Sequence, residues 1–188
     1  VAAASAAGLL FIAKLWDIVS NPLMGWISDR SETRWGRRRP YLLLGGVVSG
    51  VAMALFFSAA LTPVSQSSVL IVLTLALVGT GYTIFNVPYM AMPSEMVDDY
   101  RERTRMMSWR VGFIAIGTLV GASAQKVAEL LGAGAVGYAR MGLLYGLLIF
   151  VFMAAAFFGT AGAPMRERDV QRVTFREQLT TAIANKPF

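Results

Sequence analysis

Long apolar stretches separated by short charged segments run through most of the chain. Five of them reach the length of about 20 helical residues that crosses a hydrocarbon layer about 30 Å thick. The pattern therefore predicts an all-α membrane protein with five transmembrane helices. They are expected at residues 8–28, 41–61, 69–92, 106–131 and 141–163.

These helices are expected to form one bundle over residues 1–163, followed by a polar tail over residues 164–188. In the tail, Thr174 and Glu177 have the spacing of a capping box, and apolar residues follow on one helical face. This predicts a short helix at the membrane interface, with its basic residues facing anionic lipid headgroups. Because Val1 begins an apolar run without a basic leader, we expect the sequence to be the interior of a longer chain.

Composition supports the membrane class and excludes several kinds of chemistry. Of the 188 residues, 56% are apolar and 15% are charged, whereas soluble domains have about 45 to 50% and about 25%. The sequence has no Cys and no His, which removes thiol nucleophiles and the commonest metal ligand and general base. No nucleophile–base pair or metal-ligand spacing is visible, so we expect no enzyme, no resident metal and no cofactor.

Basic residues gather in alternate loops. Five Arg residues lie within residues 30–39, three within 101–105, and five basic residues lie in the tail, whereas loop 62–68 has none. Basic loops stay cytoplasmic, and an odd number of spans then places the tail on the same side. This predicts a multi-pass protein of the plasma (inner) membrane. Three consecutive Arg residues pinned between two spans leave little room for a duplex, so nucleic acid is not an expected partner.

Charged residues inside the first span are the sharpest feature of the sequence. Lys14, Asp17 and Asn21 have the spacing i, i+3 and i+7, which places them on one helical face. Asp17 precedes Asp29 by 12 residues, or roughly 18 Å of helix. A charge at that depth costs about 2.5 to 3.5 kcal/mol on insertion scales, so it is expected to face a cavity on a substrate or ion pathway. The alternative is that Lys14 and Asp17 merely neutralise each other.

The third expected span carries a polar stripe. Tyr82, Asn86 and Met90 follow at intervals of four residues, giving a hydroxyl, an amide and a soft apolar surface on one face. Such a stripe can bind a sugar, which needs donors, acceptors and an apolar surface for its ring. Pro88 frees a backbone carbonyl and can bend the helix. The alternative is that Asn86 joins two helices by a hydrogen bond.

Arg110 falls about two turns into the fourth span if that helix starts near Tyr100, with Asp98 and Asp99 as possible N-caps. Its planar guanidinium can bind solute, or its head can extend to the cytoplasmic boundary. Small residues at helix-contact spacing predict close packing at three Gly-xxx-Gly motifs. These motifs begin at Gly46, Gly117 and Gly142.

A charged cluster follows the first span, where Asp29 and Arg30 precede Arg37 and Arg38. One interpretation is an anchor that keeps the loop in the cytoplasm. The other is a charged latch that pairs across helices in one conformation and opens in another.

Taken together, these segments resemble the glycoside-pentoside-hexuronide:cation symporter family of the major facilitator superfamily. The resemblance implies that the five spans are helices two to six of a twelve-helix fold, and that the tail connects its two halves. Helix one and the C-terminal half would then be partners of this segment within a longer chain. The matching segments are Lys14–Gly25, Ser28–Pro40, Val87–Met92 with Glu95, and Asp98–Thr104.

The resemblance also implies roles for individual residues. The coupling cation, H⁺ or Na⁺, would be bound by Asp17, Ser20, Asn21 and Thr83. The solute would contact Lys14, Tyr82, Asn86, Met90 and Arg110. A cytoplasmic gate would contain Asp29, Arg30, Arg37, Arg38, Glu95 and Arg103.

One departure from the family concerns the cation. The family has two carboxylates on this helix, and the second position holds Asn21 here. Because Na⁺ prefers hard oxygens with compensating charge, its binding should be weaker, and coupling would run on a proton at Asp17 or be lost.

The expected function is cation-coupled symport of a glycoside-, pentoside- or hexuronide-like solute through alternating access, and it is the resemblance that implies a carbohydrate. Two alternatives within transport are an uncoupled facilitator and a carrier of a lipid-like solute. A third alternative is a membrane scaffold whose basic loops and tail recruit other proteins.

Overall fold

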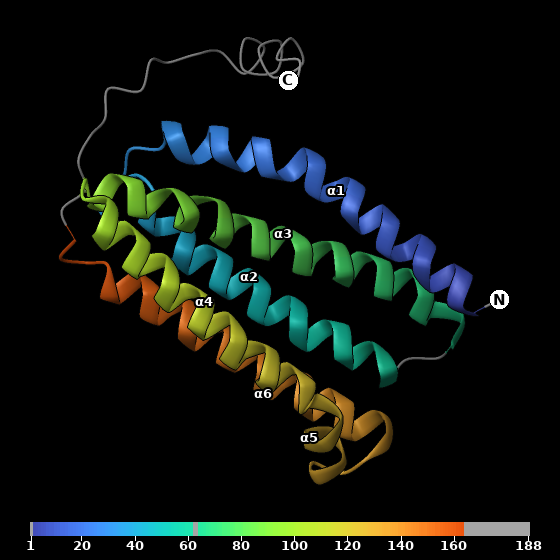
Figure 1. Cartoon of the computed structure of the whole chain (residues 1–188). Coiled ribbons are helices and arrows are strands. Elements are labelled where there is room, and N and C mark those ends of the chain that lie inside the picture. Colours follow the sequence, from blue (N-terminus) through green and yellow to red (C-terminus); the bar gives the residue numbers. More distant parts are fainter. Residues whose placement is uncertain (1, 62–63, 164–188) are drawn as a thin grey trace.

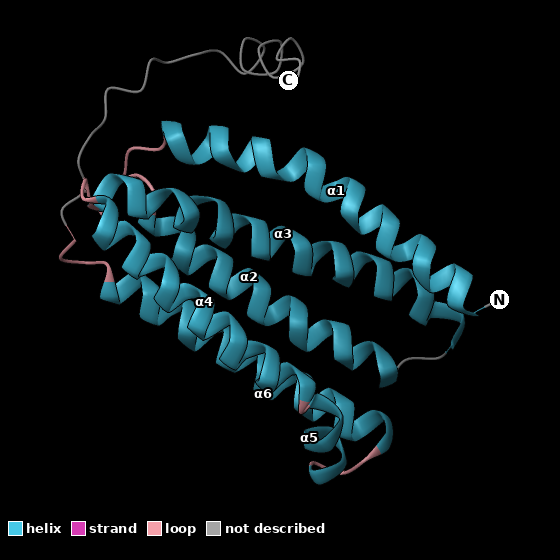
Figure 2. Cartoon of the chain, in the orientation of Figure 1, coloured by secondary structure: helices cyan, strands magenta, loops and turns pink. Residues whose placement is uncertain are grey.

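Helices make up nearly all of the chain that the structure describes. The computed structural model describes residues 2–61 and 64–163, and these contain no β-strand (Figure 2). The expected tail helix lies outside the described residues. The helices are α1 (Ala2–Arg30), α2 (Arg39–Ser58), α3 (Val64–Met96), α4 (Tyr100–Ala122), α5 (Ala124–Leu130) and α6 (Gly134–Gly159), with a short 3₁₀ helix, η1 (Ala59–Leu61), after α2.

Length and apolar composition mark three segments as membrane spans, namely α2 with η1, most of α3, and α6. Helices α4 and α5 meet the same criteria together, as one span bent by 45°. Helix α1 has 29 residues, more than the roughly 20 that a span requires, and it packs along α3. Its assignment as a fifth span rests on length and position, because it carries Lys14 and Asp17 in its interior, whereas α2, α3 and α6 carry charged residues only near their ends.

The fourth expected span, residues 106–131, is not one continuous helix. It begins at Tyr100, where the Asp99 carboxylate accepts a hydrogen bond from the Arg101 amide, and it breaks at Ser123. The Ser123 hydroxyl donates to the carbonyl of Val120 at 2.7 Å, and the Tyr145 hydroxyl of α6 donates to the same carbonyl at 2.8 Å. Side-chain hydroxyls inserted at a helix end in this way compete with the backbone ladder and bend the helix.

The helices lie roughly side by side, with α2 in contact with both α3 and α6 (Figure 1). Helix α1 packs on α3. Consecutive spans run in opposite directions, so α1 and α3 are parallel. As a result, the end of α1, the start of α2 and the end of α3 meet at one end of the bundle (Figure 1).

Small residues on two faces of α2 explain why it lies between α3 and α6. On the α6 side, a Cβ added to Gly50 would lie 2.7 Å from the Gly146 carbonyl oxygen. On the α3 side, a Cβ added to Gly45 would lie 2.7 Å from the Phe85 amide nitrogen. The backbones therefore touch without side chains between them, which is how helices associate where lipid provides no hydrophobic drive. The motifs that begin at Gly46 and Gly142 form the expected seam.

The third motif, Gly117 to Gly121, does not form the expected seam within the described chain. A Cβ added to either glycine would meet nothing within 4 Å, and α4 has no buried side chain. Hydrogen bonds hold helix α4 near its two ends. Arg103 donates to the Val97 carbonyl, and the Tyr145 hydroxyl donates to the Val120 carbonyl. Spacing alone therefore predicted a contact that the arrangement of α4 does not make.

Replacing Gly50 with Ala should destabilise the bundle, because the new methyl group would overlap the backbone of α6. Such overpacking costs about 1 to 3 kcal/mol. Gly25→Ala is the matched control, since its Cβ would lie 3.8 Å from Val87 Cγ1, an ordinary contact. Thermal unfolding in detergent should show a lower midpoint for Gly50→Ala only. Equal midpoints for the two variants would contradict the proposed packing of α2.

Candidate functional site

The contact between α1 and α3 contains polar groups at mid-span. The Thr83 hydroxyl, which is buried, donates a hydrogen bond of 3.1 Å to Asn21 Oδ1. One turn earlier on each helix, Asp17 faces Gly79, where an added Cβ would lie 3.5 Å from Asp17 Oδ1. The absence of a side chain at Gly79 lets this carboxylate approach α3.

Asp17 is paired with Lys14. The Lys14 ammonium donates to Asp17 Oδ2 at 2.9 Å, as the alternative interpretation of these charges expected. The pair is not sealed, however, because the Lys14 and Asp17 side chains are 80% and 27% exposed. The second carboxylate oxygen, Oδ1, remains directed towards α3.

The two sides of the α1–α3 contact differ in chemistry. On one side, Trp16 Nε1 donates to Thr80 Oγ1 at 2.8 Å. Helical spacing places Lys14 and Asn21 on the other side of α1, together with Tyr82 and Asn86 on α3. We call this side the polar face; it consists of Lys14, Asp17, Asn21, Tyr82, Asn86 and Met90.

Ser20 adds a hydroxyl beside this face. Its side chain is buried, and its Oγ has no hydrogen-bond partner among the described residues. Helix α1 carries Asp17, Ser20 and Asn21 close together, and Thr83 of α3 donates to Asn21. The four residues therefore supply carboxylate, hydroxyl and amide oxygens, which are suitable donors for a hard cation. Among the described residues, no cluster of three or more acidic, His or Cys side chains could hold a metal ion.

Met90 belongs to the polar face, whereas Arg110 lies on another helix, α4. Met90 is partly exposed on the same face of α3 as Asn86. Arg110 is half-buried on α4, and within the described part of the chain it makes no hydrogen bond or ion pair with the polar face. Pro88 is fully buried, and α3 continues through it as one helix.

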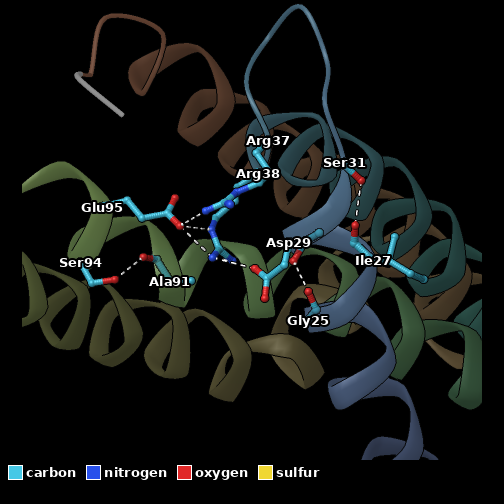
Figure 3. A network of polar contacts seen from close by, with 10 residues as sticks. Gly25, Ile27, Asp29, Ser31, Arg37, Arg38, Ala91, Ser94 and Glu95 are labelled. Carbon is cyan, nitrogen blue, oxygen red and sulfur yellow. Dashed lines mark hydrogen bonds and ion pairs between the residues drawn. The ribbon is translucent and has the colours of Figure 1, made fainter. Parts of the chain in front are cut away.

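Four of the six expected gate residues come together where α1 and α3 end (Figure 3). We call this end of the bundle the inner end. Glu95 Oε1 accepts from Arg37 at 2.7 Å and from Arg38 at 2.8 Å. Arg38 also pairs with Asp29 Oδ1 at 2.8 Å. The side chains of Arg38 and Glu95 are only 10% and 8% exposed. We call Asp29, Arg37, Arg38 and Glu95 the inner-end network.

This network balances two positive and two negative charges across three elements. Asp29 lies in the last turn of α1, Arg37 and Arg38 precede α2, and Glu95 lies in the last turn of α3. Buried charges are tolerated only where partners compensate them, so each member depends on the others.

The other two expected gate residues, Arg30 and Arg103, lie near the same end and make other contacts. The guanidinium of Arg30 lies 4.5 Å above the centre of the Trp26 ring, a cation–π contact. Arg103 donates to the Val97 carbonyl, just after the end of α3. Neither contact tests the assignment of Arg30 and Arg103 to the gate, which stays a prediction.

Arg39 was missed by the sequence analysis. It donates to the Phe157 carbonyl at 2.9 Å, and its guanidinium lies 4.8 Å above the Phe157 ring. Trp35 meets the same ring edge-on at 5.6 Å. A cation at the last carbonyls of a helix is favourable, so Arg39 ties the start of α2 to the end of α6. The only sequence signal was an Arg directly before Pro40.

Comparison with known proteins identifies a family and several relatives that are similar to this chain. The family described as MFS/sugar transport protein matches residues 1–188. The putative glycoside/cation symporter YagG of Escherichia coli is 32% identical over 94% of this chain, which spans 37% of that relative. The glucuronide carrier protein homolog of E. coli is 29% identical over 65% of the chain and 28% of its own length.

A vertebrate protein is similar over part of the chain. The sodium-dependent lysophosphatidylcholine symporter 1-A of Danio rerio is 29% identical over 64% of this chain and 23% of its own length. The chain thus spans well under half the length of each of these relatives.

Removing Glu95 should destabilise the inner end of the bundle, because two guanidinium groups would lose their shared carboxylate. Breaking a buried pair costs about 3 to 5 kcal/mol, and we expect the lower end of that range because Asp29 still pairs with Arg38. Glu129→Ala is the control, since Glu129 pairs with Lys126 at 3.9 Å and is exposed, and exposed pairs contribute little.

Thermal unfolding of Glu95→Ala and Glu129→Ala in detergent checks this expectation. A fall in midpoint for Glu95→Ala alone is the expected result. The same midpoint for both variants would show that the inner-end network does not support the fold.

Proposed function

Because this chain belongs to the MFS/sugar transport protein family, we propose that it forms part of a cation-coupled symporter. The solute is a small glycoside-, pentoside- or hexuronide-like molecule, and transport proceeds by alternating access. The family consists of transporters, so no enzymatic reaction is assigned. The names of the two E. coli relatives support this solute class.

The polar face is the observation that carries the proposal. It places an ion pair, two amides and a phenol in membrane-spanning helices, and Lys14 and Tyr82 are 80% and 54% exposed. Such groups are costly against lipid, so they line a water-filled path or a binding site. Amide and hydroxyl groups beside apolar surface suit a sugar ring. In this proposal Tyr82, Asn86 and Met90 contact the solute, with Lys14 and Arg110 as further donors.

The coupling cation is assigned to the oxygens of Asp17, Ser20, Asn21 and Thr83. Asp17 Oδ1 faces α3, and the buried Ser20 hydroxyl has no partner among the described residues. Since Asn21 contributes no charge, a proton at Asp17 fits this set as well as Na⁺ does.

The inner-end network is proposed as part of the cytoplasmic gate. It joins the ends of α1 and α3 to the start of α2 by short, mostly buried ion pairs. Two discrete pairings of such charges can distinguish two conformations of a carrier. Arg30 and Arg103 lie near this end as well, and the proposal includes them in the gate.

The membrane orientation follows from the Arg-rich loops. The loop from α1 to α2 and the loop from α3 to α4 lie at the same end of the bundle (Figure 1). The positive-inside rule places this end in the cytoplasm of a plasma (inner) membrane protein.

A lipid-like solute is the second candidate. The D. rerio relative, whose name specifies a lysophosphatidylcholine, is 29% identical over 64% of this chain. The two candidates share the polar face and differ in the solute that it binds.

Counterflow of labelled solute in vesicles containing the intact carrier tests the proposal. Exchange of a labelled glycoside or uronide should fall at least about tenfold in Asp17→Ala and in Asn86→Ala, because each loses a polar contact inside the membrane. Thr118→Val is the control, since among the described residues Thr118 bonds the Ile114 carbonyl of its own helix and no other group. A scaffold would show no exchange in any variant.

The same vesicles distinguish the remaining alternatives. Dependence on Na⁺ or on pH identifies the coupling ion, and dependence on neither indicates a facilitator. Exchange of a lysolipid without exchange of any sugar would replace the proposed solute class.

Single cysteines test the orientation, and the 188 residues contain none. In a carrier with no other cysteine, Arg105→Cys should react with an impermeant maleimide only in inside-out vesicles, because it lies at the Arg-rich end. Ala133→Cys, between α5 and α6, should react only in right-side-out vesicles. The reverse pattern would invert the proposed topology.

A further inference from the structure

The position of α1 along α3 decides whether the oxygens proposed for the cation lie together. Asp17, Ser20 and Asn21 belong to α1. Thr83 comes from α3. A slip of α1 by one turn, about 5.4 Å, would therefore separate them. The observed register recurs at three successive turns, where residues separated by 62 positions face each other, namely Asp17 with Gly79, Asn21 with Thr83, and Gly25 with Val87.

The clusters of buried apolar side chains do not hold α1 in this register. In the described chain these two clusters are built from α2, α3, α5 and α6, and α1 contributes to neither. The inner-end network does join α1 to α3, but Asp29 lies roughly 18 Å of helix from Asp17. Lipid supplies no hydrophobic drive for helix association, so a directional polar contact nearer to Asp17 is needed.

The hydrogen bond between Trp16 and Thr80 is such a contact. Trp16 Nε1 donates to Thr80 Oγ1 at 2.8 Å, and Thr80 Oγ1 donates to the Ala76 carbonyl at 2.8 Å. The single hydroxyl proton of Thr80 is thus used within α3, and the oxygen accepts from the indole, which can only donate. The direction of the bond between the two helices is therefore fixed.

This bond also selects one register, because α3 offers Trp16 no equivalent acceptor one turn away. The residues four before and four after Thr80 are Ala76 and Ile84, whose side chains carry no polar atom. A slip in either direction would take the indole N–H away from its acceptor, and a buried or lipid-facing N–H without a partner is disfavoured.

We propose that Trp16 and Thr80 are positioning residues of the cation site. Trp16 directly precedes Asp17 on α1. Thr80 directly follows Gly79 on α3, so the bond and the approach of the carboxylate to α3 depend on the same register. The inference rests on the proposed cation coupling and deepens it, by naming two residues that hold the cation oxygens in place from the opposite side of the α1–α3 contact.

Titration of counterflow with the coupling cation, in vesicles containing the intact carrier, tests this role. Trp16→Phe removes the N–H and keeps an aromatic ring, and Thr80→Val removes the hydroxyl and keeps the shape. In each variant the concentration of Na⁺ or H⁺ that gives half-maximal exchange should rise at least about threefold, which corresponds to the loss of one hydrogen bond between helices in a membrane. At saturating cation, the solute concentration for half-maximal exchange should stay within about twofold.

Further variants show whether the two residues act through one shared bond. The double variant Trp16→Phe/Thr80→Val should raise the cation requirement no more than the larger single change, because both changes remove the same contact. Thr80→Ser keeps the hydroxyl and should behave like the unmodified carrier. Trp109→Phe and Thr118→Val are the matched controls, since Trp109 is exposed on α4 without a hydrogen bond to the described residues, and Thr118 bonds within its own helix.

Other results would overturn the inference. An unchanged cation requirement in both single variants would mean that the bond does not position the cation site. Additive changes in the double variant would mean that Trp16 and Thr80 act independently. Weaker solute dependence at saturating cation would mean that they support solute binding or the fold instead. If exchange by the unmodified carrier depended on neither ion, the proposed coupling would fail, which is a different outcome from a cation-dependent carrier with unaffected variants.

Discussion

A carboxylate in the middle of an apolar helix needs a compensating charge, and the proposed function of this protein depends on how Asp17 meets that need. Lys14 supplies the charge from the preceding turn at 2.9 Å. Gly79 leaves room for the other carboxylate oxygen to face α3. Asp17 is thus neutralised and yet accessible, which is the condition for a residue that exchanges one cationic partner for another.

The surrounding helices make this arrangement possible by close backbone packing. Gly45 and Gly50 place α2 directly against α3 and α6, and Arg39 fastens the end of α6 to the start of α2. At the inner end, Arg38 joins Asp29 of α1 to Glu95 of α3. The polar face therefore lies on helices that are joined by ion pairs at one charged end.

Helical period and span length were sufficient to predict three spans, α2, α3 and α6, and the shared face of Lys14 and Asp17, because each follows from residues on one helix. The bond from Thr83 to Asn21 depends on how far α1 is displaced along α3, which no single-helix pattern specifies. The contact of Arg39 with Phe157 joins residues 118 positions apart. The break at Ser123 depends on Tyr145 of another helix, so neighbouring structure overrode the continuous apolar pattern.

The accessibility of the polar face is the most direct test of this account. Tyr82 on the polar face and Leu77 on another side of α3 are both exposed in the described chain. In the intact carrier, Tyr82→Cys should react with an impermeant thiol reagent and be protected by solute, whereas Leu77→Cys should remain unreactive. An unreactive Tyr82→Cys, or equal labelling of both positions, would contradict a wet solute path along α1 and α3.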